Sequence, residues 1–319
     1  MSLAVLRSRA LAGMQAPEVA VEVHVANGLP AFSLVGLPDA EVREARDRVR
    51  AAILSSGFEF PARRITVNLA PADLPKESGR FDLPIALGIL VASGALDAPA
   101  LERFEFAGEL SLTGALRPVR GALAMALGAR EAGRCFVLPA ESAAEAVLVG
   151  GVEVRAATSL LDVCAHLCGR GELPQAVPVV AHAAPLYPDL ADVRGQLQAR
   201  RALEIAAAGQ HSLLMSGPPG TGKSMLAARF PGLLPDMTER EALETAALQS
   251  SAGLFDTALL ARRPFRAPHH SASAAALVGG GVTYQNKREV IEYVATEIAA
   301  HCRGRADGKY WIYQHFLIP

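Results

Sequence analysis

Residues 217–224 read Gly217-Pro218-Pro219-Gly220-Thr221-Gly222-Lys223-Ser224. They fit the pattern G-x-x-x-x-G-K-S, which is typical of a loop that binds the phosphates of a nucleotide. An apolar run over residues 211–216, suited to a buried strand, precedes the loop, and a helix-compatible run over 223–234 follows it. Because this chemistry needs strand, glycine-rich loop and helix in that order, the pattern predicts an α/β fold.

Each residue type in the loop has a chemical reason to be there. Glycines let the backbone turn tightly and bring its N–H groups to the phosphates, and the start of the helix adds its dipole. Lys223 would place a point charge on the β- and γ-phosphates, and the Ser224 hydroxyl would ligate Mg²⁺. We therefore predict ATP and Mg²⁺ as cofactors. The predicted nucleotide-binding residues are Gly217, Pro218, Pro219, Gly220, Thr221, Gly222, Lys223 and Ser224.

Length, net charge and the distribution of charged residues limit the kinds of protein that this chain can be. A chain of 319 residues with 51% hydrophobic content can form two domains with real cores. The formal net charge of −1 provides no global electrostatic attraction to nucleic acid, so any DNA contact must be local. Arg7 and Arg9 interrupt the N-terminal apolar run, and the uncharged apolar run over residues 83–96 is too short to span a membrane. We expect a soluble cytoplasmic protein with no membrane partner.

The four cysteines are too few and too scattered for a disulfide framework. Cys164 and Cys168 lie four residues apart on a predicted helix. They fit either two cysteines of a core or, with further ligands, a metal site.

The first half of the chain alternates strand and helix patterns, which predicts a compact α/β or α+β domain. The clearest strand alternates over residues 19–25, and Asp39 is a predicted helix cap. The predicted strands are several within 3–35, then 64–69, a hairpin of 104–112 with 115–119, 135–138 and 152–156. The predicted helices are 40–55, 83–93, 121–132 and 159–168.

Two motifs in this half resemble a known domain. They are Pro75-Lys76-Glu77-Ser78-Gly79, and Gly108-Glu109-Leu110-Ser111-Leu112-Thr113-Gly114 followed by Leu116-Arg117-Pro118-Val119. Both look like the proteolytic domain of Lon proteases, a ribosomal protein S5 domain 2-like α+β fold. The same layout opens the magnesium-chelatase-like AAA+ ATPases of the YifB/ComM family. The resemblance extends over residues 1–281.

A Lon protease needs a nucleophilic serine at the start of the helix over 83–93 and a lysine in the helix after the hairpin. Residues 80–84 contain no serine, and residues 121–130 contain no lysine. Lys76 and Ser78 lie in the loop and match neither catalytic position. We predict that the chain is not a peptidase, as the resemblance to the YifB/ComM family also implies.

The resemblance implies four segments. Residues 1–168 form the Lon-like domain, 169–189 a Pro- and Gly-rich linker, 190–281 the N-terminal part of the AAA+ domain, and 282–319 an atypical tail. In similar ATPases a Gly-Gln element at this distance before the phosphate loop packs near the adenine. Here that element implicates Val193 and Gln196, which equally fit an ordinary start of a helix.

A second loop and a helix follow the phosphate loop. Thr238 is a predicted cap for a helix over 239–249. Residues 262–271 then combine arginines, one phenylalanine and the adjacent His269 and His270. This loop fits a contact with nucleic-acid phosphates, a contact with a neighbouring subunit, or packing on the ATPase core.

The sequence changes character after residue 281. Four of the five tyrosines and the only tryptophan lie in residues 282–319. The family continues into a strand ending in Asp-Glu, the Walker B motif that holds Mg²⁺ and activates water, but no such strand occurs between Ser224 and Pro319. The chain thus looks truncated before Walker B, with a tail that is either foreign to the fold or a divergent natural end.

The leading interpretation is an ATP-binding AAA+ ATPase. By resemblance it is a hexameric DNA branch-migration helicase motor in recombination or transformation, with branched or single-stranded DNA as partner. Hydrolysis should be slow without the Asp-Glu pair. The alternatives are a magnesium-chelatase-type motor subunit and a non-hydrolysing nucleotide-binding remnant.

Overall fold

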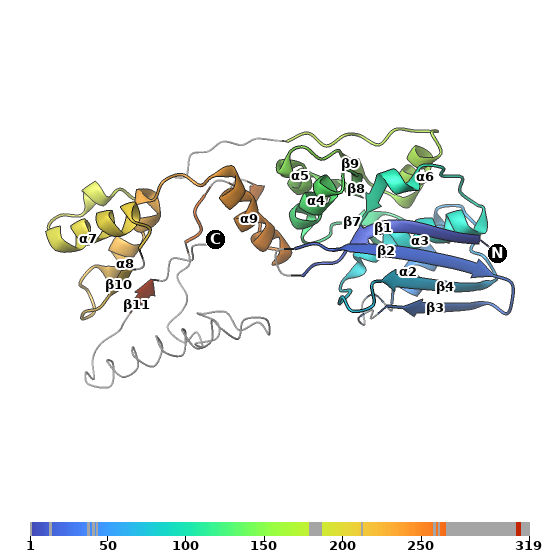
Figure 1. Cartoon of the computed structure of the whole chain (residues 1–319), viewed down its shortest axis with the longest axis horizontal. Helices are drawn as coiled ribbons and strands as arrows, with labels where there is room; N and C mark the ends of the chain where they lie inside the picture. The colour runs from blue at the N-terminus through green and yellow to red at the C-terminus, as the bar shows by residue number, and fades with distance from the viewer. Residues whose placement is uncertain are drawn as a thin grey trace. The chain divides into compact units, whose positions relative to one another are not determined.

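The computed structural model describes residues 2–12, 15–36, 39, 42, 44–178, 187–211, 213–257, 260, 262–265 and 311–313. The chain divides into two compact units (Figure 1). Unit 1 comprises Met1–Ala183 with Ala242–Leu260, and unit 2 comprises Ala184–Glu241 with Ala261–Pro319. None of the described helices is long and apolar enough to cross a membrane.

The first layer of unit 1 is a four-stranded sheet with the order β1-β2-β4-β3. Its strands are β1 (Ser2–Arg9), β2 (Glu18–Ala26), β3 (Ala31–Val35) and β4 (Arg64–Ala70). The pairs β1–β2 and β2–β4 are antiparallel, and β3 runs parallel to β4. Alternate residues of β2 are buried, as the sequence pattern predicts for a strand with one face on the core. The strands predicted within 3–35 and at 64–69 are confirmed.

Two helices, α2 (Ala45–Ser55) and α3 (Asp82–Ser93), lie on one face of this sheet (Figure 1). Almost every residue of α3 is buried, which explains why its sequence is apolar all round. Gly88 lets α3 approach β2, because a Cβ there would lie 2.5 Å from Cγ2 of Val23. Asp39 accepts the Val42 N–H at 2.7 Å, as predicted for a cap. Residues 40, 41 and 43 of the predicted helix lie outside the described residues.

The second layer of unit 1 is a parallel sheet with the order β5-β8-β9. Its strands are β5 (Phe104–Phe106), β8 (Cys135–Pro139) and β9 (Val154–Ala157), and its helices are α4 (Ala122–Glu131), α5 (Ala140–Ala146) and α6 (Leu160–Leu167). The predicted strands at 135–138 and 152–156 are confirmed, as are the helices at 121–132 and 159–168. The sequence analysis missed α5, because its alanine-rich segment has no clear apolar period.

The predicted hairpin of 104–112 with 115–119 is wrong in its first part. Only β6 (Glu109–Leu110) and β7 (Leu116–Arg117) pair antiparallel, whereas β5 pairs in parallel with β8. Between β5 and β6 the backbone leaves the direction of β5. The Gly108 N–H donates to the Arg80 carbonyl at 2.9 Å, and the Gly108 carbonyl accepts from Leu83. This segment therefore joins the start of α3 rather than continuing one hairpin.

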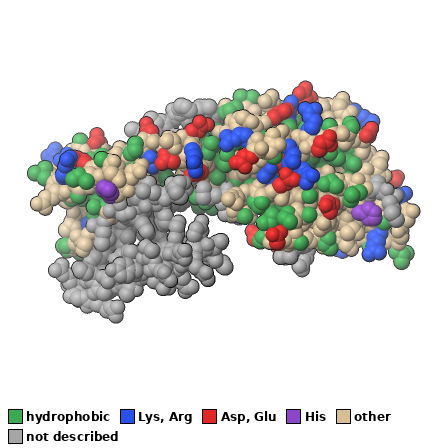
Figure 2. Space-filling model, in the orientation of Figure 1, with side chains coloured by type: hydrophobic (Ala, Val, Ile, Leu, Met, Phe, Trp, Pro, Cys, Tyr) green, Lys and Arg blue, Asp and Glu red, His purple; other side chains and the backbone are tan. Residues whose placement is uncertain are grey.

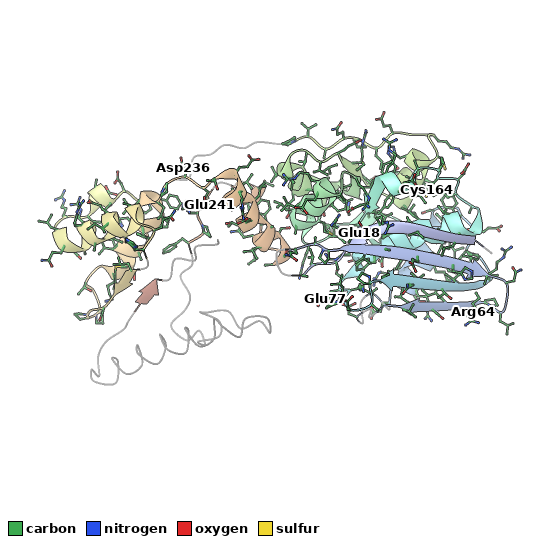
Figure 3. All side chains as sticks on the ribbon, in the orientation of Figure 1. Glu18, Arg64, Glu77, Cys164, Asp236 and Glu241 are labelled. Carbon is green, nitrogen blue, oxygen red and sulfur yellow. The ribbon has the colours of Figure 1, made fainter. Side chains whose placement is uncertain are left out.

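Helix α9 (Glu239–Ser251) follows the phosphate loop in sequence but mostly packs within unit 1. Thr238 caps it as predicted. The Thr238 Oγ1 accepts from the Glu241 N–H at 3.3 Å, and the Glu241 carboxylate accepts from the Thr238 N–H at 2.8 Å (Figure 3 labels Glu241). Further along, Leu243 and its neighbours lie in the core around α4, and Gly121 N–H donates to the Ser250 carbonyl. The sequence instead predicts one domain over residues 190–281, whereas Ala242–Leu260 lie in unit 1.

Unit 2 contains η4 (Leu190–Asp192), α7 (Leu197–Ala208), β10 (Leu213–Met215), α8 (Lys223–Ala227) and η5 (Phe230–Leu233). Its core gathers Leu203, Leu226 and Phe230. The single helix predicted over 223–234 is wrong. It breaks into α8 and η5, where Pro231 lacks the N–H that a continuing α-helix needs. Helix α7 begins at Leu197, directly after Gln196.

Within the described residues, β10 pairs antiparallel with β11 (Trp311–Tyr313). This is the only described part of the atypical tail. The other residues of 282–319 lie outside the described residues, so the prediction of a tail foreign to the fold stays a prediction.

Asp82, the first residue of α3, gives unit 1 a dependence on pH. Arg48 Nε donates to its Oδ2 at 2.7 Å, yet burial raises the pKa of Asp82 from 3.8 to about 6. The folded protein thus holds this proton more tightly than the unfolded chain. The protonated Asp82 carboxyl therefore contributes fully to the free energy of unfolding below about pH 4, and this contribution is lost as the pH rises through about 6.

We therefore expect the free energy of unfolding of the wild type, relative to Asp82→Asn, to fall by about 2–3 kcal/mol between about pH 4 and pH 7. Urea unfolding of both proteins across this range measures the difference. Asp47→Asn is the control, because Asp47 lies in the exposed part of α2. A difference that does not change with pH would contradict the prediction.

Candidate phosphate-binding site

The candidate site is the loop that joins β10 to α8. All eight residues of 217–224 are described, and their contiguity brings them together. Gly220 and Gly222 both adopt φ of 82°, a left-handed conformation that side chains other than glycine rarely tolerate. At Gly222 a Cβ would also lie 3.0 Å from Nε2 of Gln196. The backbone therefore requires glycine where the sequence pattern has it.

Lys223 is the buried cation of the loop, with 8% of its surface exposed. Its Nζ donates to the Gly217 carbonyl at 2.7 Å and to the Pro218 carbonyl at 2.8 Å. It also lies 3.2 Å from Oγ1 of Thr221, which itself donates to the Pro218 carbonyl at 3.0 Å. The ammonium group is thus held against the loop, and its stem packs in unit 2.

Most of the other predicted residues of the loop face solvent. Pro218, Pro219, Gly220, Thr221 and Ser224 are exposed. A phosphate chain can therefore reach the loop backbone without displacing a core side chain. The exposed hydroxyl of Ser224, the second residue of α8, suits an oxygen ligand of Mg²⁺. The Lys223 ammonium group, the exposed loop backbone and the Ser224 hydroxyl together fit a magnesium-bound nucleotide.

Gln196 contacts the loop, which the sequence alone did not predict. Its Nε2 donates to the Thr221 carbonyl at 2.8 Å across 25 residues of sequence. Gln196 has φ of 50° and stands at the start of α7, where its carbonyl accepts from the Arg200 N–H. Val193 is instead buried in the core of unit 2. A contact of either residue with adenine stays a prediction.

Comparison with known proteins places the chain in a family. The family models described as "Subunit ChlI of Mg-chelatase" and "Magnesium chelatase, subunit ChlI" match residues 21–142 and 189–291. The competence protein ComM of Haemophilus influenzae is 54% identical over 290 residues, covering 88% of this chain and 56% of ComM. The chain belongs to the magnesium-chelatase-like YifB/ComM family.

Two further relatives match the chain with similar identity and over a similar share of their own length. The uncharacterized protein YifB of Escherichia coli is 52% identical over 88% of this chain and 56% of its own length. The uncharacterized protein Rv2897c of Mycobacterium tuberculosis is 46% identical over 86% of this chain and 55% of its own length. The chain therefore spans about half the length of the curated relatives that it matches.

In this YifB/ComM family member, the described part of the arginine-rich loop, residues 262–265, makes structural contacts. Arg263 Nε donates to the Pro235 carbonyl at 2.7 Å, and its own carbonyl accepts from the Tyr187 hydroxyl at 2.9 Å. The Arg262 guanidinium lies 5.1 Å from the centre of the Tyr187 ring. Residues 266–271, with His269 and His270, lie outside the described residues.

The start of α3 is the place where a Lon protease would carry its serine. Here residues 80–84 contain no serine, and Asp82 begins the helix with its Oδ2 accepting the Leu110 N–H at 3.2 Å. In the preceding loop, Ser78 Oγ accepts from Arg80 Nε at 2.9 Å, and Lys76 Nζ donates to the Pro71 carbonyl (Figure 3 labels Glu77 between them). Ser78 and Lys76 thus each bind a different partner.

The predicted cysteine pair lies at the end of α6. Cys164 is buried in the core of unit 1, and burial raises the pKa of its thiol to about 12. The Cys168 thiol donates to the Asp97 carbonyl at 3.4 Å. Among the described residues no group of three or more His, Cys, Asp or Glu side chains could hold a metal ion. Cys164 therefore has the surroundings of a core residue.

Proposed function

We propose that this chain binds Mg·ATP through residues 217–224. The observation that carries the proposal is the position of Lys223, buried at its stem and with its ammonium group against the carbonyls of Gly217 and Pro218. In that place a bound triphosphate would find a cation and a glycine-rich backbone with free N–H groups. Lys223 would contact the β- and γ-phosphates, and Ser224 would ligate Mg²⁺.

We further propose that the chain forms part of an AAA+ motor that acts on branched or single-stranded DNA. The support is the 54% identity to a protein named for competence, together with the match of both parts of the chain to magnesium chelatase family models. The motor would be a homohexamer in the cytoplasm. Figure 2 shows basic and acidic side chains intermixed on the visible face of unit 1, and the net charge of the chain is −1, which favours a local DNA contact.

Two other functions have specific support. Both matching family models describe a subunit of magnesium chelatase, which favours a motor that drives metal insertion into a tetrapyrrole. The sequence between Ser224 and Pro319 also contains no apolar run ending in Asp-Glu, which favours nucleotide binding without turnover by this span.

The experiment that tests the proposal is a titration of the purified chain with a fluorescent ATP analogue, with Mg²⁺ and with EDTA. We expect saturable binding that weakens severalfold when Mg²⁺ is removed, because the metal neutralises phosphate charge at Ser224. Absence of binding under both conditions would overturn the proposal.

Steady-state hydrolysis then separates the three functions. Turnover that branched DNA stimulates more than linear duplex selects the DNA motor. Turnover that responds to a porphyrin and chelatase partner subunits selects the chelatase motor. Binding without turnover under any of these conditions selects the non-hydrolysing module.

A further inference from the structure

We propose that Gln196 is a positioning residue that holds the phosphate loop in its binding conformation. The inference rests on the proposed function and concerns the same loop. It assigns to Gln196 a role on the loop backbone, distinct from any contact with adenine.

The geometry of one hydrogen bond carries the inference. Gln196 Nε2 donates to the Thr221 carbonyl at 2.8 Å. The Thr221–Gly222 peptide is planar and trans, so its carbonyl and its N–H point in opposite directions. By holding the carbonyl, Gln196 turns the Gly222 N–H to the other side of the loop. That N–H is one of the donors a phosphate-binding loop needs.

The loop has few other restraints at this point. Gly220 and Gly222 flank Thr221, and glycine explores more backbone conformations than any other residue. Thr221 is itself exposed, and its hydroxyl binds within the loop at the Pro218 carbonyl. Lys223, the first residue of α8, also contacts that hydroxyl, with its Nζ at 3.2 Å. Gln196 acts on a different atom, since it ties the Thr221 carbonyl to the start of α7.

The backbone that carries the Gln196 side chain is held in place by α7. Gln196 precedes α7, whose Leu203 and neighbours belong to the core of unit 2. Arg200 Nη1 donates to the Val193 carbonyl at 3.2 Å, and the Arg200 N–H donates to the Gln196 carbonyl at 3.0 Å. The backbone on both sides of Gln196 is thus fixed by α7. Its left-handed φ of 50° directs the side chain from this fixed point.

Three variants of the full chain test the role. Gln196→Asn keeps an amide and a residue type that tolerates left-handed backbone, but it is one methylene too short to keep the contact. Gln196→Glu keeps the length but removes the donor. Gln198→Ala is the matched control, because Gln198 is an exposed glutamine in the first turn of the same helix.

We expect Gln196→Asn to weaken binding of the fluorescent ATP analogue about fivefold to tenfold, the usual effect of one lost hydrogen bond. Gln196→Glu should weaken it further, since its carboxylate repels phosphate. Gln198→Ala should bind as the wild type does. In the nucleotide-free protein, the Leu226 amide, which donates to the Gly222 carbonyl at 2.9 Å, should exchange hydrogen about tenfold faster in both Gln196 variants, with the rest of unit 2 unchanged.

The outcomes separate the two proposals. If the wild type does not bind the analogue, the proposed function fails, while faster amide exchange in the variants would still support the role of Gln196 on the loop. If the wild type binds and the Gln196 variants match it in both affinity and amide exchange, the role of Gln196 is overturned and nucleotide binding stands. Faster exchange throughout unit 2 would show a general structural role and would also overturn the inference.

Discussion

Replacing Lys223 with methionine should raise the dissociation constant for Mg·ATP about a hundredfold. The ammonium group would make charge-assisted hydrogen bonds to phosphate oxygens, each worth about 1.5–3 kcal/mol, and a hundredfold corresponds to about 2.7 kcal/mol. Methionine keeps most of the buried apolar stem and removes the ammonium group, with its charge and its hydrogen-bond donors. The titration with the fluorescent ATP analogue measures the change.

The fold of unit 2 should survive the substitution. The carbonyls released by the lost Nζ belong to Gly217 and Pro218, and Pro218 is exposed, so water can replace the ammonium group. Circular dichroism and thermal unfolding should therefore match the wild type closely. This separates loss of the site from loss of the fold.

A matched control removes a cation elsewhere in unit 2. Arg201 lies on α7 and pairs with Glu204 at 2.9 Å in an exposed salt bridge. Arg201→Ala lowers the net charge of the chain by the same amount as Lys223→Met, so a purely electrostatic, non-specific attraction would weaken equally in both. Unchanged affinity in Lys223→Met would show that nucleotide binds elsewhere than at residues 217–224.

Local patterns predicted the tight turn of the loop and the cap of α9, but not the bounds of the helix that follows the loop. The spacing of the loop glycines predicted a tight turn, and Gly220 and Gly222 do adopt left-handed backbone. Thr238, three residues before Glu241, is a capping signal readable from the sequence, and both hydrogen bonds of the capping box form. Such signals act within a few residues, so the chain itself displays them.

Contacts between distant residues were not predictable in this way. Gln196 and Thr221 are 25 residues apart, and nothing in either neighbourhood indicates that one side chain will bind the other carbonyl. The pairing of β5 with β8 and the packing of α9 in unit 1 depend on which apolar surfaces meet. Each apolar face has several possible partners of similar composition, and only the assembled core selects among them.

One contact between distant residues, the buried ion pair of Glu105 with Arg9, should be essential for the stability of unit 1. Glu105 on β5 is fully buried and accepts two hydrogen bonds from Arg9 on β1, at 2.6 and 2.7 Å. Arg134 Nη1 donates to the same carboxylate at 2.9 Å. Glu105→Ala should therefore cost about 3–5 kcal/mol of unfolding free energy, because it leaves the Arg9 charge buried without a counter-ion.

The neighbouring Glu18 provides the matched control. It also binds Arg134, at 2.6 Å, but about a third of its side chain is exposed (Figure 3). Water can solvate Arg134 when Glu18 is removed, so Glu18→Ala should cost no more than about 1 kcal/mol. Urea unfolding of the two variants compares a buried and a part-exposed carboxylate that share one partner.

A double variant tests whether the cost comes from the unpaired charge. Arg9 fills its site tightly, since a Cβ at Gly128 would lie 2.3 Å from Arg9 Nη1. Replacing both partners, as Arg9→Met with Glu105→Leu, removes the charge while keeping most of the volume. The double variant should be more stable than Glu105→Ala alone, because no buried ion is left without a partner. If it is less stable, packing by the Arg9 stem, rather than the unpaired charge, dominates the loss.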